Sequence, residues 1–221
     1  MSIRKQSFEN EEYYHIYNRG VDKRTIFEDA HDTQRFLKSI IEFNVPDPIG
    51  SLYANSFRQL SGETPKLEER LVDIIAYCLN PNHFHFILKQ IRDGGISEFM
   101  KRLGGGYTSY FNNKYARTGA LFQGVFKDKH IGANEYLLHV SAYVNLNDRV
   151  HKLSGETSKL VESKSSWNEY IDEKVKGICE KEIVLGQFRN SKEYKEFAID
   201  SLELMLQRKE EQKDLAALFI E

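Results

Sequence analysis

Residues 80–88 read Asn-Pro-Asn-His-Phe-His-Phe-Ile-Leu, and they directly follow an apolar, β-branched run over residues 71–79. Asn-Pro-Asn is typical of a tight turn, so the two runs predict a β-hairpin. Side chains alternate between the faces of a strand, which places the apolar side chains on one face and His83 and His85 together on the other. Their backbones are then about 7 Å apart, close enough for both imidazoles to bind one metal ion. The same pattern also fits a half-exposed strand with its polar side chains outward, and two histidines alone do not make a metal site.

Length and composition restrict the class of protein. The 221 residues suffice for one ordinary domain and an appendage, and a hydrophobic content of 40% supports a globular core. No apolar run reaches the length of a membrane span, and the first residues lack the apolar core of a signal peptide. With only two cysteines, Cys78 and Cys179, we expect neither a disulfide framework nor a cysteine-based zinc site. These features predict a cytoplasmic protein with no membrane partner.

Charge is unevenly distributed along the chain. The net charge of −2 argues against a generally basic nucleic-acid-binding protein. Residues 92–152, however, contain nine Lys or Arg and five Asp or Glu, whereas residues 153–221 contain eleven and fifteen. The basic share therefore lies in the segment that follows the histidine strand, and this is where a DNA-binding surface is expected. A solvated surface of mixed charge is the alternative.

The N-terminal part predicts a strand followed by a helix. Residues 13–18 read as the strand. Asp32 is the expected N-cap of a helix with apolar residues at helical spacing, and prolines at positions 46 and 48 end it. Residues 46–69 are polar and rich in turn formers, so we expect a loop there.

Two further helices and one more strand follow the hairpin. A long amphipathic helix is predicted over residues 96–111, and its three consecutive glycines at 104–106 indicate either a kink or a close approach to the backbone. Residues 119–127 predict a strand, and residues 134–147 predict another amphipathic helix. The first six elements give the order β-α-β-β-α-β, which predicts an α+β, ferredoxin-like antiparallel sheet with helices on one face and a free face for a ligand.

The last seventy residues give weaker signals. Residues 1–152 are therefore predicted to form the main domain, and residues 153–221 a helical extension packed on it. Residues 60–67 and 153–160 are nearly identical octamers that look like polar loops. The expected pieces of the extension are an aromatic anchor and two helices, at residues 165–170, 181–189 and 192–208.

One stripe of the helix predicted over residues 134–147 carries candidate functional groups. Tyr143 and Asn147 are four residues apart, about 6 Å along a helix axis. If the stripe faces the histidine pair, the Asn147 carboxamide oxygen can reach the ion and the Tyr143 hydroxyl can reach a group bound to it. An aromatic stripe that simply packs in the core is the alternative.

Four segments of the chain occur together, in order, in one known family. They read Tyr-His-Ile-Tyr-Asn-Arg-Gly, Ala-Tyr-Cys-Leu-Asn-Pro-Asn-His-Phe-His, a tyrosine-rich stretch that runs into Arg-Thr-Gly-Ala-Leu-Phe-Gln-Gly-Val-Phe-Lys, and Tyr-Val-Asn-Leu-Asn, at residues 14–20, 76–85, 107–127 and 143–147. This combination resembles the single-tyrosine transposases of the His-hydrophobic-His class, especially the REP-associated tyrosine transposases. The resemblance runs from about residue 13 to residue 150. Residues 166–170 are similar to a feature of longer members.

The resemblance implies a ferredoxin-like domain that cuts single-stranded DNA near hairpins. His83 and His85 correspond to the metal ligands, Tyr143 to the nucleophilic tyrosine, and Asn147 to the auxiliary ligand. The implied cofactor is Mg²⁺ or Mn²⁺. One residue departs from the pattern, because Asp148 stands where the family usually has proline. An added carboxylate could ligate the metal or repel phosphate, so the third ligand stays open.

The expected reaction is metal-dependent cleavage and strand transfer through a 5′-phosphotyrosine intermediate, carried out by a monomer or a homodimer. Single-stranded DNA requires cations for its phosphates and flat groups for its bases. The polar and basic residues that could supply the DNA contacts are Asn18, Arg19, Lys101, Arg102, Lys114, Arg117, Lys127 and Lys129.

Two other functions fit the same residues. A protein derived from a transposase could bind hairpin DNA without cutting it. A metal-dependent phosphodiesterase could use water as its nucleophile, with Tyr143 only structural. The intact histidine pair and Tyr143 favour the strand-transferase.

Overall fold

The computed structural model describes residues 7–47, 69–151 and 162–218. The elements up to the fourth strand are β1 (Tyr13–Arg19), the 3-10 turn η1 (Val21–Lys23), α1 (Ala30–Glu42), β2 (Val72–Asn80), β3 (His83–Gln90), α3 (Gly95–Lys114) and β4 (Lys127–Ile131). The elements after it are α4 (Asn134–Asn145), α5 (Asn147–Val150), β5 (Lys164–Ser165), α6 (Trp167–Ile171), α7 (Glu182–Leu185) and α8 (Ser191–Leu218).

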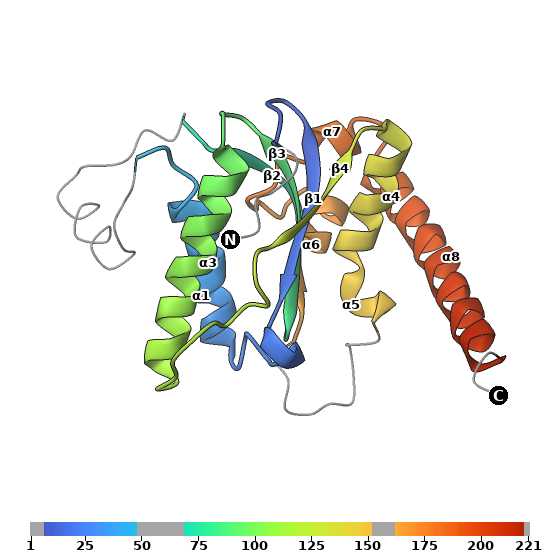
Figure 1. Ribbon diagram of the computed structural model, residues 1–221. Helices are drawn as coiled ribbons and strands as arrows, with labels where there is room; N and C mark the ends of the chain where they lie inside the picture. The colour runs from blue at the N-terminus through green and yellow to red at the C-terminus, as the bar shows by residue number, and fades with distance from the viewer. Residues whose placement is uncertain (1–6, 48–68, 152–161, 219–221) are drawn as a thin grey trace.

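The strands form one antiparallel sheet in the order β4-β1-β3-β2-β5 (Figure 1). The predicted β-α-β-β-α-β order and the α+β class are therefore confirmed, and helices follow in the C-terminal part. The hairpin turn is the Pro81-Asn82 pair between β2 and β3. Backbone N–H groups of Ile26 and Phe27 donate to the Pro81 carbonyl, which fixes this turn against the segment before α1.

Two hydrophobic cores lie on the two faces of the sheet. Phe84, Phe86 and Leu88 of β3 pack with α1 and α3. Ile87, whose side chain points the opposite way, packs with α4, α6 and α8. A bulge between Ile74 and Ala76 also shifts the register of β2.

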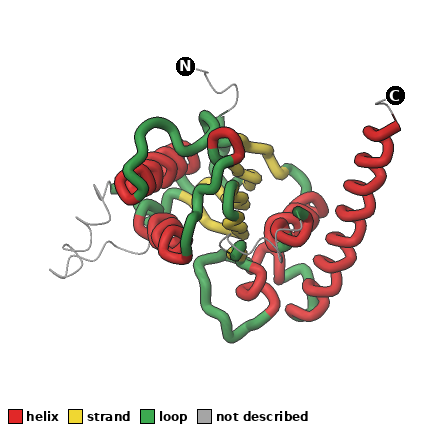
Figure 2. The backbone as a smooth tube through the Cα atoms, turned by 90° about the horizontal axis from the view of Figure 1, so that it is seen from below, coloured by secondary structure: helices red, strands yellow, loops and turns green. Residues whose placement is uncertain are grey.

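The prediction of helices on one face holds for α1 and α3, but the other face is not free, because α4 and α8 cover part of it. Figures 1 and 2 show α1 and α3 on one side of the strands and α4 with α8 on the other. Apolar residues of α4, among them Leu137, Val140 and Val144, bury themselves against the second face. Burial of this amphipathic helix leaves only part of that face open, and the polar residues of β1 and β3 lie in that part.

Several predicted boundaries shift. The N-cap of α1 is Asp29, whose side chain accepts from the Asp32 N–H, while Asp32 itself is buried within the first turn. Residues 119–126 form no strand, since Gly119 and Gly124 have positive φ angles that interrupt an extended run. Only Phe122 pairs there, in an isolated bridge with Gly20, and β4 begins at Lys127.

The triple glycine does not interrupt α3, which is helical from Gly95 to Lys114. A Cβ at position 106 would lie 2.7 Å from the Phe43 ring, whereas none would meet an atom within 4 Å at Gly104 or Gly105. The close approach expected from the glycines is therefore found at Gly106. The Phe43 side chain is the neighbour that requires it.

The C-terminal part contributes β5, which pairs with the edge of β2, and α8, which packs on α4. Helix α8 is longer than expected, and α7 is shorter. None of the described helices is long and apolar enough to span a membrane. Both octamers and the domain boundary at residue 152 lie outside the described residues, so the division into two domains stays a prediction.

Candidate active site

Strand β3 presents His83 and His85 on the sheet face that α4 partly covers. In the register of the sheet, Tyr17 of β1 lies opposite His85, and Arg19 lies opposite His83. The two imidazoles are perpendicular, with ring centroids 5.2 Å apart. His85 is only 7% exposed, whereas His83 is partly buried. The alternation predicted from residues 83–88 is thus the one that the strand has.

Asn147 reaches the histidine pair from the end of α4. The helix breaks at Leu146, whose φ and ψ are −113° and 20°, and Asn147 begins the short helix α5. Its Oδ1 accepts a hydrogen bond of 2.7 Å from Asn80 Nδ2 and lies 3.1 Å from His83 Nε2. The Asn147 side chain is fully buried, and its Nδ2 has no hydrogen-bond acceptor among the described residues.

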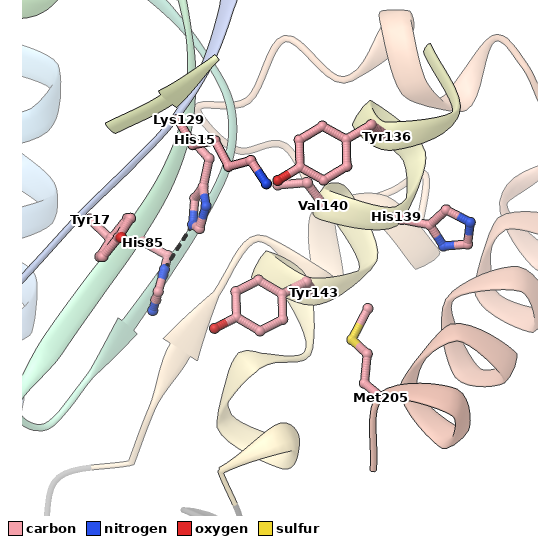
Figure 3. A pocket seen from close by; sticks show the side chains of 9 residues that line it. All are labelled: His15, Tyr17, His85, Lys129, Tyr136, His139, Val140, Tyr143 and Met205. Carbon is pink, nitrogen blue, oxygen red and sulfur yellow. Dashed lines mark hydrogen bonds between the residues drawn. The ribbon is translucent and has the colours of Figure 1, made fainter. Parts of the chain in front are cut away.

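Tyr143 lies on α4 beside the same imidazoles. Its ring centroid is 5.5 Å from that of His85 and 5.9 Å from that of His15, edge-on in both cases. His15 Nε2 lies 2.9 Å from His85 Nδ1. Figure 3 shows the Tyr143 hydroxyl pointing to the side of the pocket where the other ring nitrogen of His85 points.

His15, His85 and Tyr143 line a pocket of about 430 Å³ between the sheet, α4 and α8, whereas His83 and Asn147 lie outside its lining. Lys129 of β4 contributes its ammonium group, which lies 4.7 Å from the centre of the Tyr136 ring. Hydrogen bonding to Tyr136 raises the pKa of Lys129, so this amine is positively charged. The pocket therefore combines imidazoles, a phenol and a cation, a set that suits a phosphate group.

Burial keeps the imidazoles neutral. It lowers the pKa of His15 to about 4, and it lowers the pKa of His85 well below its usual value, with further lowering from the neighbouring histidines. Burial also lowers the pKa of His83, while its hydrogen bond to Asn147 opposes that change. Neutral imidazole is the form that binds metals. Burial raises the pKa of the Tyr143 hydroxyl, and the neighbouring Asn147 side chain opposes the rise.

Residues 55–147 match the family described as "Transposase IS200 like". This stretch contains β2, β3, β4 and α4, but not β1, which carries His15 and Tyr17. The chain resembles the IS200-like transposases. The match spans less than half of the chain and ends at Asn147. The resemblance predicted from the four sequence segments is confirmed.

A solved structure described as a REP-associated tyrosine transposase bound to a REP hairpin is also similar. It shares 14% sequence identity with this chain, and the alignment has a TM-score of 0.48 and covers 80% of this chain and 90% of the other. No protein of curated function is a significant match.

The residues at the candidate site fit the divalent cation that a likeness to these transposases implies. Ligands at right angles around an octahedral ion, each about 2.1 Å from it, are about 3 Å apart. His83 Nε2 and Asn147 Oδ1, at 3.1 Å, have this separation, and a cation held by both would replace the neutral Asn80 amide that now contacts them at 2.9 and 2.7 Å. A neutral imidazole nitrogen and a carboxamide oxygen are both suitable donors for Mn²⁺, and the oxygen suits Mg²⁺. His85 offers the nitrogen that does not face His15.

A second group of potential ligands lies at the start of α1. Atoms of Asp29, His31 and Asp32 lie within 4.8 Å of one another. The Lys114 ammonium, however, donates to both carboxylates at 2.7 Å. A cation there would have to displace Lys114, so the group is better described as an ion-pair cluster that joins α1 to α3.

Asp148, which replaces the usual proline, points elsewhere. It lines a separate pocket together with Arg149, Lys164 and Trp167, and none of the three imidazoles of the site lines that pocket. Asp148 therefore does not line the pocket that contains His15, His85 and Tyr143.

The polar and basic residues predicted to bind DNA fall into two groups. Arg102 donates to Glu98 and to the carbonyls of Val45 and Pro46, and its side chain is only 14% exposed. Lys114 is held by the two aspartates of the α1 cluster. These contacts favour structural roles for Arg102 and Lys114.

The other six predicted DNA-binding residues lie at or near the surface. Arg19 donates to Gln123, Asn18 donates to the Gly124 carbonyl, and Arg117 donates to Asn112. Lys101 is 79% exposed at its side chain. The two lysines of β4, Lys127 and Lys129, are exposed. Of these six residues, Lys129 is the one that lines the pocket with Tyr143.

Three residues at the site were not predicted. His15 was hidden within a predicted strand, although its alternation with Tyr17 would have placed both on one face. Asn80 belongs to the turn motif, which predicts a turn and gives no sign of a contact with Asn147 and His83. His151, whose ring centroid is 5.6 Å from that of His83, follows Asn147 by one helical turn and had no sequence signal of its own.

Proposed function

We propose that this protein cleaves and rejoins single-stranded DNA near hairpins, with Tyr143 as the nucleophile and with His83, His85 and Asn147 as the ligands of a divalent cation, Mg²⁺ or Mn²⁺. The observation that carries the proposal is the placement of the Tyr143 ring 5.5 Å from His85, in the same pocket. The similarity of residues 55–147 to IS200-like transposases supports it. A cytoplasmic location and the choice between monomer and homodimer stay predictions of the sequence.

The cation would neutralise a scissile phosphate and orient it for in-line attack. The Tyr143 hydroxyl oxygen then forms a bond to phosphorus while the bond from phosphorus to the 3′ oxygen breaks. The tyrosine proton leaves to water, and the departing 3′ oxygen takes up a proton. The products are a 5′-phosphotyrosine and a free 3′ hydroxyl, and attack by a 3′ hydroxyl on the same phosphorus reverses the step.

The burial of Tyr143 supports a role for the cation. Because burial raises the pKa of its hydroxyl, the phenol is neutral at pH 7 and is a weak nucleophile on its own. A nearby positive charge favours the phenolate. The bound cation would supply such a charge, and Lys129 lines the same pocket.

For the DNA-binding surface, we propose the six predicted residues other than Arg102 and Lys114, because the contacts of those two favour structural roles. Lys127 and Lys129 lie on the exposed edge strand β4, next to the end of β1 that carries Asn18 and Arg19. A single strand that follows this edge would bring a phosphate to the pocket. The remaining two members of the surface are Lys101 and Arg117.

A labelled hairpin oligonucleotide tests the proposal. With Mn²⁺, a label at the 3′ end should move with the protein on a denaturing gel, because the 5′ phosphate of that fragment is joined to tyrosine, and a label at the 5′ end should not. Tyr143→Phe should abolish the adduct. Tyr136→Phe, which removes a hydroxyl from the same helix and pocket, should keep it. An adduct that persists in Tyr143→Phe would reject the assignment.

Other results would support the alternatives. A gel shift of the hairpin without cleavage in any divalent cation would favour a non-cutting hairpin-binding protein. Released products without a protein-bound intermediate, unaffected by Tyr143→Phe, would favour hydrolysis by water.

A further inference from the structure

His15 and His85 form a buried contact between neighbouring strands. His15 Nε2 and His85 Nδ1 are 2.9 Å apart, a hydrogen-bond distance. The rings are close to parallel, with centroids 5.1 Å apart, and the two residues are 9% and 7% exposed. In the register of the sheet His15 lies opposite Ile87 and His85 opposite Tyr17, so the pairing of β1 with β3 brings the two imidazoles to the same place on one face.

Only one of two proton arrangements lets His85 bind a cation. A neutral imidazole carries one N–H and one lone pair. If His15 donates through Nε2, the proton of His85 must lie on its own Nε2, and that nitrogen cannot be a ligand. If His85 donates through Nδ1, its Nε2 presents a lone pair. Figure 3 shows that this second nitrogen points away from His15, on the side of the Tyr143 hydroxyl.

We propose that His15 is a positioning residue that accepts a hydrogen bond from His85 Nδ1 and thereby turns the lone pair of His85 Nε2 toward the cation. This inference rests on the proposed function. Ligating histidines in general bond through their second ring nitrogen to a partner that fixes the tautomer. Here the partner is a second imidazole on an adjacent strand, with its own proton on Nδ1.

His15 is better placed as a support than as a ligand. Its Nε2 faces His85, whereas the Asn147 oxygen lies against His83 at the other end of the pair. A ligand role would leave His85 Nδ1 without its partner. The support role and the ligand role make different predictions for His15→Gln, because the glutamine side-chain oxygen can accept the same hydrogen bond from His85.

Mn²⁺ affinity of the full chain, measured by electron paramagnetic resonance, tests the inference without any DNA. His15→Phe keeps the ring size and removes the acceptor, so Mn²⁺ binding should weaken about 10- to 100-fold. His15→Gln should retain most of the affinity. His130→Gln is the matched control on β4, since His130 bonds to Glu12 instead, and it should bind as the unmodified protein does. Should His15→Phe fail to fold, His15→Met offers a flexible apolar replacement.

The outcomes separate this inference from the proposed function. If the double variant His83→Ala/His85→Ala binds Mn²⁺ as well as the unmodified protein does, the metal site fails, and the inference fails with it. If binding depends on that pair but His15→Phe binds normally, only the inference is overturned. Equal, complete loss in His15→Gln and His15→Phe would make His15 a ligand and overturn it too.

Nitrogen-15 chemical shifts of the Mg²⁺-loaded protein give a second readout. The inference expects His85 protonated at Nδ1 and His15 unprotonated at Nε2. Finding the proton on His15 Nε2 would overturn it.

Discussion

At the level of single residues, the site depends on side chains that are buried and paired with one another. Asn147 connects Asn80 to His83, and His15 connects β1 to His85. The helical spacing of Tyr143 and Asn147 offered Asn147 as a ligand on one continuous stripe, whereas the structure places Asn147 beyond a break at Leu146, at the start of α5. The phenol of Tyr143, by contrast, lies on α4 as its spacing predicted.

Asn147 and its neighbour Asp148 provide a matched pair of substitutions. Asn147→Ala removes one of the two partners of Asn80 Nδ2, the other being His83 Nε2 at 2.9 Å, and should lower the free energy of unfolding by about 1 kcal/mol. It should also weaken Mn²⁺ binding. Asp148→Asn should leave Mn²⁺ affinity unchanged, because Asp148 lines a different pocket. Titration of both variants with Mn²⁺ measures this, and a loss only in Asp148→Asn would contradict the assignment of ligands.

At the level of elements, the triple glycine of α3 gives a prediction with opposite signs at adjacent positions. Gly105→Ala should stabilise the protein by up to about 1 kcal/mol, since a Cβ there meets nothing within 4 Å. Gly106→Ala should destabilise it by about 1–3 kcal/mol, because the Cβ would meet the Phe43 ring at 2.7 Å. Urea denaturation of both variants measures the difference. Equal effects would contradict the packing of Phe43 on α3.

The ion pair between α1 and α3 makes stability depend on pH. Burial raises the pKa of Asp32, but hydrogen bonds from Lys114 and Tyr115 outweigh it and leave that pKa below its usual value. A lowered folded-state pKa contributes stability above pH 4, and this contribution is lost as the pH falls through the folded value. We expect Lys114→Met to cost about 2 kcal/mol at pH 7 and to reduce the loss of stability between pH 5 and pH 3.

Unfolding free energies at pH 7, 5 and 3 measure this effect. Lys101→Met is the control, because Lys101 is exposed and its one ion pair within the described part of the chain is with Glu98 at 3.4 Å. An unchanged pH dependence in Lys114→Met would show that the pair does not hold the carboxylate ionised.

At the level of the whole molecule, local sequence patterns predicted the order of strands and helices. They did not predict that α4 and α8 form a layer on the second face of the sheet. The turn at Pro81-Asn82 and the alternation in β3 are local features that periodicity and turn chemistry report directly. Where α4 packs is decided by long-range burial of Leu137 and Val140 against the sheet, which periodicity cannot specify. The glycines at 119 and 124 displaced the predicted strand because positive φ angles outweighed its apolar composition.

The C-terminal extension should unfold together with the sheet. Tyr194 of α8 is fully buried and hydrogen-bonded to Ser141 and Asn145 of α4. Trp167, the single tryptophan of the chain, lies 6.3 Å from the Tyr194 ring and so reports on this region. Denaturation curves from Trp167 fluorescence and from far-ultraviolet circular dichroism should coincide. Separate transitions would show that the extension is an independent unit.

The most direct test of the account is the identity of the residue that becomes joined to DNA. The adduct formed with a hairpin oligonucleotide and Mn²⁺ would be trimmed with nuclease, digested with protease and sequenced by mass spectrometry. Of the twelve tyrosines in the chain, Tyr143 should carry the remaining nucleotide. A nucleotide on Tyr136 or on any other residue would contradict the account.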